Sequence, residues 1–219
     1  MNWIGSPSGD AQVLWLKADS PIRSIADMKT TPEVVGASSK NADNYVVATL
    51  ANQLLDAKFR IVGGYDGTSE IFLAAERGEI KGSFTGYRGI AASRPLWIKD
   101  GSIRLLMQFG ADRLPELPDV PTALELGESD ETKDMLRLFA IKYMAQFPFV
   151  LPPSVAPRRL EMVRSAFDAT MRDAEFIAES NRSGMALDPV GGDRIAQMIR
   201  DTEKLPPTTL ERLRALLKP

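Results

Sequence analysis

The sequence predicts an α/β fold built around a largely parallel β-sheet. Short apolar or alternating segments, typical of strands, alternate along the first half of the chain with segments that carry apolar residues at helical spacing. Polar or glycine-rich loops follow three of these strands, beginning at Ser38, Gly64 and Thr85. In open α/β sheets, the loops at the carboxyl ends of parallel strands line the ligand crevice.

Each predicted strand is a short apolar run bounded by turn or helix-start residues. The strands span residues 11–18, 33–37, 58–62, 80–85, 103–109 and 147–151. The predicted helices combine helical spacing with recognisable first or last residues. They span residues 24–28, 44–55, 68–77, 129–145, 157–171, 173–182, 193–204 and 210–219. Residues 114–121 contain three prolines and predict an extended linker.

Four of these helices have start or stop signals that can be checked individually. Ser24 is expected to cap the first helix, and Ser129 opens another in which Glu131 fits a capping role. Pro157 occupies the first helical position, which prolines favour. Gly184 is expected to end the helix before it. The methionines of the second half fall at helical core spacing and are interpreted as packing residues.

Composition excludes several classes of function. The 219 residues carry 27 Lys and Arg against 29 Asp and Glu, and this net charge of −2 disfavours nucleic acid as a partner. The chain has no cysteine and no histidine, so disulfides, thiolate nucleophiles, His-based triads and Cys or His metal sites are excluded. No phosphate-binding GxxxxGK[ST] motif is present. We therefore expect a binding protein, not an enzyme, with no cofactor and no metal.

The start of the sequence and the length of its apolar runs bear on localisation. Residues 1–7 have neither a basic nor an apolar region of the kind that a signal peptide needs. No window approaches about 18 unbroken apolar residues, so no membrane span is predicted. If Met1 is the natural start, the expected compartment is the cytoplasm.

Several stretches together resemble a known family, the periplasmic solute-binding receptors of tripartite tricarboxylate transporters, also called Bug or TctC-like receptors. The stretches are VVGASSKNADNYVVATL (34–50), VGGYDGTSEIFLAAERGEI (62–80), RLPELPDVPTALEL (113–126) and FVLPPSVAPRRLEMVRSAFDATMRDAEF (149–176). The most specific parts are LPDVPT (117–122) and LPPSVAPRRL (151–160). The similarity extends over nearly the whole chain from Trp3 onward.

The resemblance implies a type II periplasmic-binding-protein-like architecture of two α/β lobes. Residues 22–101 would form the second, ligand-binding lobe, and residues 1–21 and 102–219 the remainder of the first. Family members begin with an export signal and a glycine-rich strand–loop–helix that this sequence does not contain, so the first lobe is expected to be incomplete at its N-terminus. Because such a lobe would expose apolar surface, we expect self-association. The resemblance also implies a periplasmic location and membrane transporter subunits as partners.

The family binds small carboxylates between its lobes, and helix N-termini supply the backbone N–H groups that can hold them. Carried over by position, the ligand residues would be Ser38, Ser39, Lys40, Asn41, Tyr65, Gly67, Thr68, Ser69, Thr85 and Tyr87. The alternative interpretation is structural: Ser and Asn also favour turns, and Thr68 and Ser69 would serve as N-caps. Tyr65 would then be a partly buried aromatic residue, and Gly67 would serve the backbone only.

Two acids in the same loops, Asp43 and Asp66, complicate carboxylate binding because as N-caps they would occupy the N–H groups and add like charge. Lys40 and Arg88 could offset that charge. The sequence therefore leaves two functions open. One is a receptor, or the remnant of one, for a di- or tricarboxylate. The other is a non-transport interaction protein or a non-functional relic with the same fold.

Overall fold

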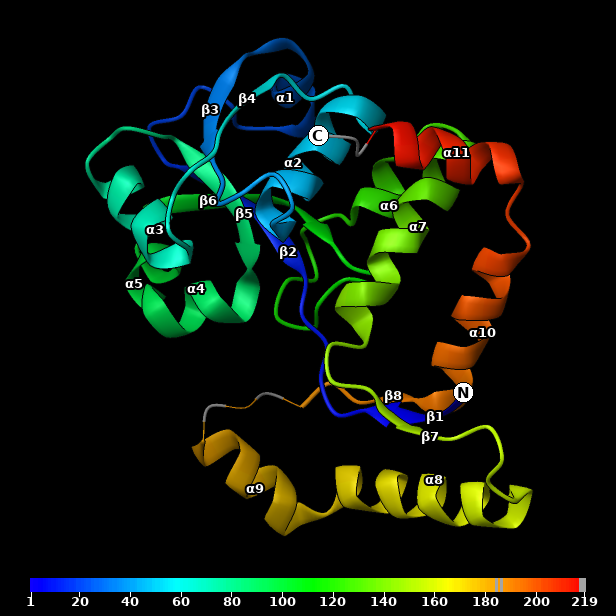
Figure 1. Cartoon of the computed structure of the whole chain (residues 1–219). Coiled ribbons are helices and arrows are strands. Elements are labelled where there is room, and N and C mark those ends of the chain that lie inside the picture. Colours follow the sequence, from blue (N-terminus) through cyan, green and yellow to red (C-terminus); the bar gives the residue numbers. More distant parts are fainter. Residues whose placement is uncertain (184, 186, 217–219) are drawn as a thin grey trace.

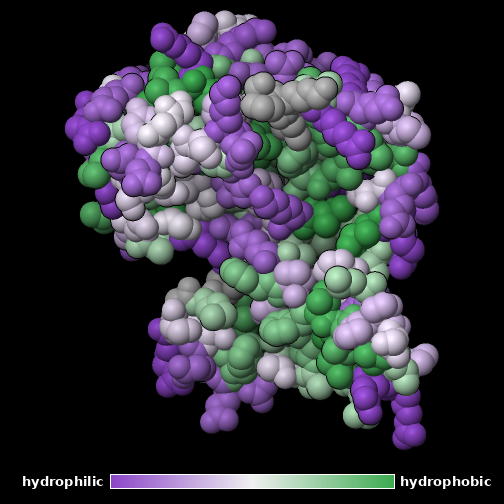
Figure 2. Space-filling view, viewed as in Figure 1, coloured by the Kyte–Doolittle hydropathy of each residue, from purple (hydrophilic) through white to green (hydrophobic). Residues whose placement is uncertain are grey.

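The computed structural model describes residues 1–183, 185 and 187–216, which form two bodies of unequal size joined at a waist (Figures 1 and 2). We call the body around the five-stranded sheet the large lobe. The small lobe contains a three-stranded sheet with helices α8, α9 and α10. The N-terminus lies in the small lobe (Figure 1).

The elements follow the order expected for an α/β protein. The strands are β1 (Asn2–Ser6), β2 (Gln12–Lys17), β3 (Glu33–Gly36), β4 (Phe59–Val62), β5 (Gly82–Gly86), β6 (Ile103–Phe109), β7 (Phe149–Leu151) and β8 (Val190–Gly191). The helices of the first half are α1 (Ile25–Thr30), α2 (Asp43–Leu54), α3 (Thr68–Glu76), α4 (Tyr87–Ser93) and α5 (Pro95–Lys99). Those of the second half are α6 (Ala123–Leu126), α7 (Asp130–Met144), α8 (Pro157–Arg172), α9 (Ala174–Arg182), α10 (Gly192–Glu203) and α11 (Pro207–Leu216).

The five-stranded sheet has the order β4-β3-β5-β2-β6. Strands β4, β3 and β5 are parallel neighbours, whereas β2 is antiparallel to both β5 and β6. Strand β6 therefore runs in the same direction as β5, and only β2 is reversed in this sheet as described. This confirms the α/β class with a largely parallel sheet. The three-stranded sheet β7-β1-β8 is instead antiparallel at both pairings.

Two apolar clusters cover the two faces of the large sheet. On one face, Leu14, Phe84 and Met107 pack with apolar residues of α2, α7 and α11. On the other face, Trp15 and Phe72 pack with α3, α4 and α5. The alternation of β2 explains this arrangement, because successive strand residues point to opposite faces and each face here is covered by helices.

The five-stranded sheet extends beyond the lobe boundaries expected at residues 22 and 101. Strands β2 and β6 lie outside that range, yet both are members of the five-stranded sheet. Helices α7 and α11 also pack in the apolar cluster around Leu14, Phe84 and Met107. We therefore propose a large lobe that includes β2 and β6, with the first crossing between the lobes at residues 7–11.

Most element predictions are confirmed within a few residues, and the differences have local causes. Ser129 does cap α7, but its side chain accepts the N–H of Thr132, so Glu131 is not the capping partner. The capping box lies instead at Thr122 and Glu125 of α6. Helix α3 begins from Gly67, so neither Thr68 nor Ser69 is its N-cap. The stop expected at Gly184 and the last residues of the C-terminal helix lie outside the described residues.

The small lobe buries few of its side chains. Helix α8 has no buried residue in the part of the chain described, although one of its faces is apolar. The methionine prediction is wrong for two residues of this lobe, because Met162 is 65% exposed and Met185 is 51% exposed. Met135 and Met144 of α7 are buried as predicted. The small lobe therefore exposes apolar side chains. Among the described helices, none is long and apolar enough to cross a membrane.

Candidate functional site

Three strand-to-helix connections lie at the carboxyl ends of β3, β4 and β5. They are residues 37–42, residues 63–67 and the direct junction of β5 with α4 at residues 86–87, and we call them the crevice loops. The first two are bonded to each other, since the Gly64 N–H donates to the Ser38 carbonyl at 2.6 Å and the Tyr65 N–H to the Ala37 carbonyl at 3.4 Å. Because β4, β3 and β5 are adjacent parallel strands, the third loop follows at the same edge of the sheet.

Each crevice loop leads into a helix whose own N-cap residue provides no side-chain cap. The N-cap residues of α2, α3 and α4 are Ala42, Gly67 and Gly86, and none makes a side-chain hydrogen bond to its helix. Helices α1, α6, α7 and α9, by contrast, carry Ser24, Thr122, Ser129 and Asp173 as side-chain caps. At α2 and α3 such a start presents free N–H groups and partial positive charge, which together favour a carboxylate. At α4 the Tyr87 and Arg88 N–H groups instead donate to the Ala11 carbonyl and the Asp10 carboxylate.

The first crevice loop is shaped by Ser38 and presents its next three residues to solvent. Ser38 and Asn44 bond reciprocally: the Ser38 N–H donates to Asn44 Oδ1 at 3.1 Å, and Asn44 Nδ2 donates to Ser38 Oγ at 3.3 Å. Ser39, Lys40 and Asn41 are exposed. The sequence predicted all four as ligand residues. In the structure, the bonds between Ser38 and Asn44 hold the loop.

The residues predicted around the second and third loops also include both exposed and buried side chains. Thr68 and Ser69 are exposed at the start of α3, after Gly67, whose φ is +90°. Tyr65 and Tyr87 are half-buried against the α3–α5 side of the sheet, and burial raises the pKa of both phenols. Thr85 is buried, and its Oγ1 accepts the indole N–H of Trp15 at 3.0 Å. Among the predicted site residues, Thr85 thus has its hydroxyl turned into the core.

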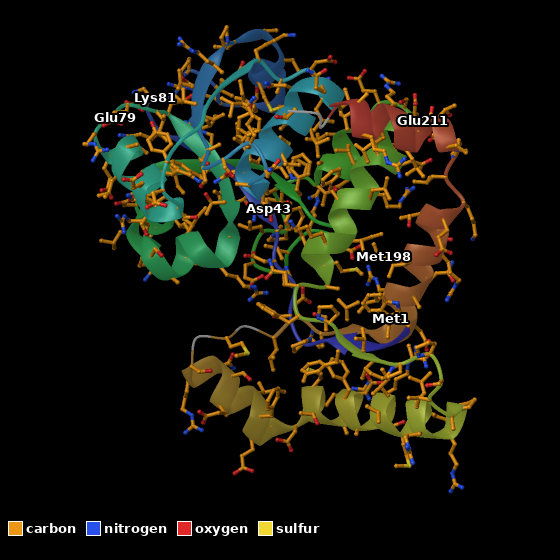
Figure 3. All side chains as sticks on the ribbon, in the orientation of Figure 1. Met1, Asp43, Glu79, Lys81, Met198 and Glu211 are labelled. Atoms are coloured by element: carbon orange, nitrogen blue, oxygen red, sulfur yellow. The ribbon has the colours of Figure 1, made fainter. Side chains whose placement is uncertain are left out.

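Neither acid of these loops caps a helix. Asp43, which is labelled in Figure 3, is the first residue of α2. Its carboxylate pairs with Lys142 of α7. Asp66 lies before Gly67, and its N–H donates to the Glu70 carboxylate at 2.6 Å. The expected competition for backbone N–H groups does not arise within the described residues. Lys142, which the sequence reasoning missed, compensates the charge of Asp43.

A polar cluster that the sequence did not indicate joins α4 to the crossing between the lobes. Asp10 Oδ1 accepts the N–H of Ala11 at 2.8 Å and of Arg88 at 3.4 Å. Arg88 Nε donates to the Gly9 carbonyl at 3.0 Å. Burial raises the pKa of Asp10. The contacts join residues 78 and 79 positions apart, so no local sequence signal could have predicted them.

Metal binding has no candidate in the described part of the chain, where no group of three or more His, Cys, Asp or Glu is placed to hold an ion. The crevice loops instead combine free N–H groups with hydroxyl and amide side chains. That chemistry can bind an anion, but it supplies no nucleophile activated by a base.

Comparisons with known proteins bear on the fold of the chain. No family model matches the chain. The "UPF0065 protein in gbd 5′region" of Cupriavidus necator is 24% identical over 222 residues, which cover 97% of this chain and 62% of that protein. The chain thus spans less than two thirds of the length of this curated relative.

Solved structures show which fold this is. A TctC solute-binding protein from Polaromonas superposes with a TM-score of 0.64 at 16% identity, covering 91% of this chain and 67% of that one. An R. palustris protein with adipate gives 0.56 at 14% identity, covering 99% and 68%. MatC from Rhodopseudomonas palustris with bound malate gives 0.54 at 14% identity, covering 99% and 69%. The resemblance to TctC-type solute-binding proteins and the periplasmic-binding-protein-like fold are thereby confirmed.

Proposed function

We propose that this chain, which has the fold of TctC-type solute-binding proteins, binds a small organic acid at its crevice loops. The observation that carries the proposal is the pair of uncapped helix starts, α2 and α3, which follow the adjacent parallel strands β3 and β4. Two solved proteins of the same fold hold adipate and malate, and both of these ligands are dicarboxylates. The proposed ligand class is therefore a di- or tricarboxylate.

In this proposal the backbone N–H groups at the starts of α2 and α3 receive one carboxylate. Ser39, Asn41, Thr68 and Ser69 add hydroxyl and amide hydrogen bonds from the two loops, and Lys40 adds positive charge. Ser38 and Gly67 give the loops their shape, and Tyr65 and Tyr87 form the half-buried wall between them. Thr85 acts indirectly, by fixing the end of β5 to Trp15.

The wider setting of this function is also a proposal. We infer that the chain works as a receptor, without catalysis, in the periplasm and delivers its acid to membrane subunits of a tripartite tricarboxylate transporter. The support is the resemblance of sequence and fold to TctC-type proteins.

Self-association is a separate proposal, supported by the apolar surface of the small lobe. Val150 of β7 is 41% exposed and Met162 of α8 is 65% exposed. Contacts between copies would remove such surface from water. The same surface supports the second candidate function, an interaction protein that docks a partner there. Light scattering at micromolar concentration that finds a monomer would contradict self-association.

The carboxylate site can be tested at Ala42, the N-cap of α2, whose extended backbone suits a capping residue. Calorimetry with malate and adipate would compare the natural chain with Ala42→Asp and Ala42→Asn. The aspartate would occupy an N–H group and add like charge, so we expect affinity to fall about tenfold or more. The asparagine adds the cap without the charge and should cause a smaller loss.

A matched control is Ala156→Asp, because Ala156 is the uncapped N-cap of α8 in the small lobe. It should leave dicarboxylate affinity unchanged. The proposal fails if neither acid binds the natural chain, or if Ala42→Asp binds as tightly as the natural chain.

A further inference from the structure

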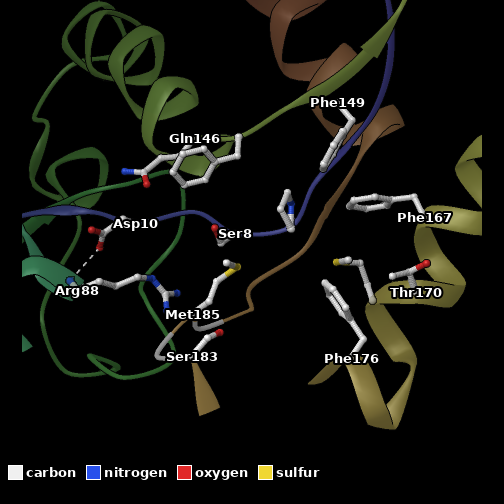
Figure 4. A pocket seen from close by; sticks show the side chains of 13 residues that line it. Ser8, Asp10, Arg88, Gln146, Phe149, Phe167, Thr170, Phe176, Ser183 and Met185 are labelled. Carbon is white, nitrogen blue, oxygen red and sulfur yellow. Dashed lines mark hydrogen bonds between the residues drawn. The ribbon is translucent and has the colours of Figure 1, made fainter. Parts of the chain in front are cut away.

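A cavity of about 810 Å³ lies beside the waist, on the small-lobe side of the crossing between the lobes (Figure 4). Its size falls within the range of about 300–1,000 Å³ that is typical of sites for small organic ligands. Four aromatic side chains form most of its apolar wall: Phe147, Phe149, Phe167 and Phe176. Phe147 and Phe149 are 63% and 58% exposed, so their rings are not buried in the core and can contact a ligand.

The opposite end of the cavity is polar. Figure 4 shows Asp10 and Arg88 across from Phe149, Phe167 and Phe176. Arg88 belongs to α4 of the large lobe, and its side chain crosses to the small-lobe side, where Nε donates to the Gly9 carbonyl. The cavity therefore has an apolar body and, at its polar end, one cationic and one acidic side chain.

The Arg88 guanidinium has donors to spare. Within the described residues, its Nη1 atom is buried and has no hydrogen-bond partner. The same Nη1 atom lies 3.5 Å from a carboxylate oxygen of Glu116, an ion pair without hydrogen-bond geometry, and the Glu116 side chain remains 37% exposed. A buried donor left unpaired is unfavourable, so an acceptor supplied by a ligand would be stabilising there.

We propose that this cavity binds an amphipathic monocarboxylic acid, with its carboxylate on Arg88 and its apolar body among the four phenylalanines. A carboxylate can accept two parallel N–H bonds from a guanidinium, which makes it the best complement to the free donors. A second carboxylate on the ligand would be desolvated against the aromatic wall, which disfavours the short diacids proposed for the crevice loops.

This site is separate from the proposed carboxylate site. None of the predicted crevice residues from Ser38 to Tyr87 lines the cavity. The nearby acids do not block it. Asp10 already accepts the Ala11 and Arg88 N–H groups, and Glu116 can keep its exposure to water when a ligand approaches.

The test is a homologous series of butanoate, hexanoate and octanoate, measured by calorimetry on the natural chain. Each added methylene that enters the cavity should tighten binding about fourfold. Octanol has the same number of carbon atoms but no carboxylate, and it should bind at least about tenfold more weakly than octanoate.

Variants separate the two ends of the cavity. Arg88→Met should weaken all three acids by a similar factor of about ten or more, and Arg88→Lys should restore part of the loss because it keeps the charge. Phe149→Gln should reduce the gain per methylene, and its exposure lets the fold tolerate the change. Met162→Gln, on an exposed α8 residue that does not line the cavity, is the matched control and should have no effect.

Three results would overturn the proposal. Affinity could be independent of chain length, or octanoate could bind equally well to the natural chain, Arg88→Met and Phe149→Gln. Alternatively, octanoate could fail to bind while Phe149→Gln dissolves a concentration-dependent dimer, which would make a second copy the occupant. A failure of the proposed carboxylate site at the crevice loops can be distinguished from a failure of this proposal. Ala42→Asp should not change octanoate binding, and Phe149→Gln should not change malate binding.

Discussion

The pairing of Trp15 with Thr85 decides how one predicted ligand residue is used. Trp15 is fully buried on β2, between β5 and β6 of the large sheet, and its indole N–H donates to Thr85 Oγ1 at 3.0 Å. Replacing Thr85 with valine keeps the side-chain shape and removes the acceptor. The buried N–H is then left without its partner.

The magnitude follows from that unpaired donor. A buried polar group that loses its partner costs about 1–3 kcal/mol, whereas the net value of an ordinary hydrogen bond is only about 1 kcal/mol. Thr85→Val should therefore lower the free energy of unfolding by about 1–3 kcal/mol, which is roughly a 5- to 150-fold change in the folding equilibrium. Thr85→Ser keeps the hydroxyl and should lose less, chiefly the packing of one methyl group.

Urea unfolding followed by fluorescence gives these free energies. A double-mutant cycle isolates the pair, because Trp15→Phe removes the indole N–H and should abolish most of the additional cost of Thr85→Val. The reasoning is refuted if Thr85→Val costs the same in both backgrounds, or if it leaves stability unchanged. Weaker malate binding at unchanged stability would instead give Thr85 a direct role in the ligand site.

Two further predictions concern a cap and a loop. Arg113 and the Thr122 N–H hold the pKa of Glu125 at about 2, below its ordinary 4.5, so its contribution to stability is full above about pH 4.5 and is lost as pH falls toward 2. Glu125→Gln should flatten the pH dependence of the unfolding free energy in that window, and an unchanged profile would contradict the assignment. Gly67→Ala should destabilise by about 1–3 kcal/mol through backbone strain alone, since φ is +90° and no atom lies within 4 Å of the added Cβ. Gly63→Ala, at ordinary φ in the same loop, is the control and should cost less in thermal unfolding.

Local periodicity predicted the large lobe well because its signals are local. The alternation of β2 and the helical spacing of α2 and α3 reflect burial against one sheet, and the structure places these elements within a few residues of the prediction. Strand β1 was not predicted, because its residues are set by pairing with β7, about 150 positions away. The short helices α4 and α5 carry too few turns for a periodic signal.

The candidate site divides along the same line. Polar residues after strands marked the first two crevice loops, and the structure bonds those loops to each other through Ser38 and Gly64. The sequence pattern gave no sign that Thr85 points into the core, because a threonine at a strand end serves a ligand or a tryptophan equally well. The pairing of Arg88 with Gly9 depends on how the two lobes meet, which is a tertiary property.

Adjacent residues of α4 connect the two proposed sites. Tyr87 belongs to the third crevice loop, and the next residue, Arg88, crosses the waist to the cavity of the small lobe. The backbone N–H groups of both residues are anchored to the crossing, through the Ala11 carbonyl and the Asp10 carboxylate. A substitution of Arg88 leaves these backbone bonds in place but removes the Nε bond to the Gly9 carbonyl beside them, so its effect on dicarboxylate binding does not distinguish the sites. Ala42 and Phe149 each contact only one of them, and for that reason the decisive comparisons rest on those two residues.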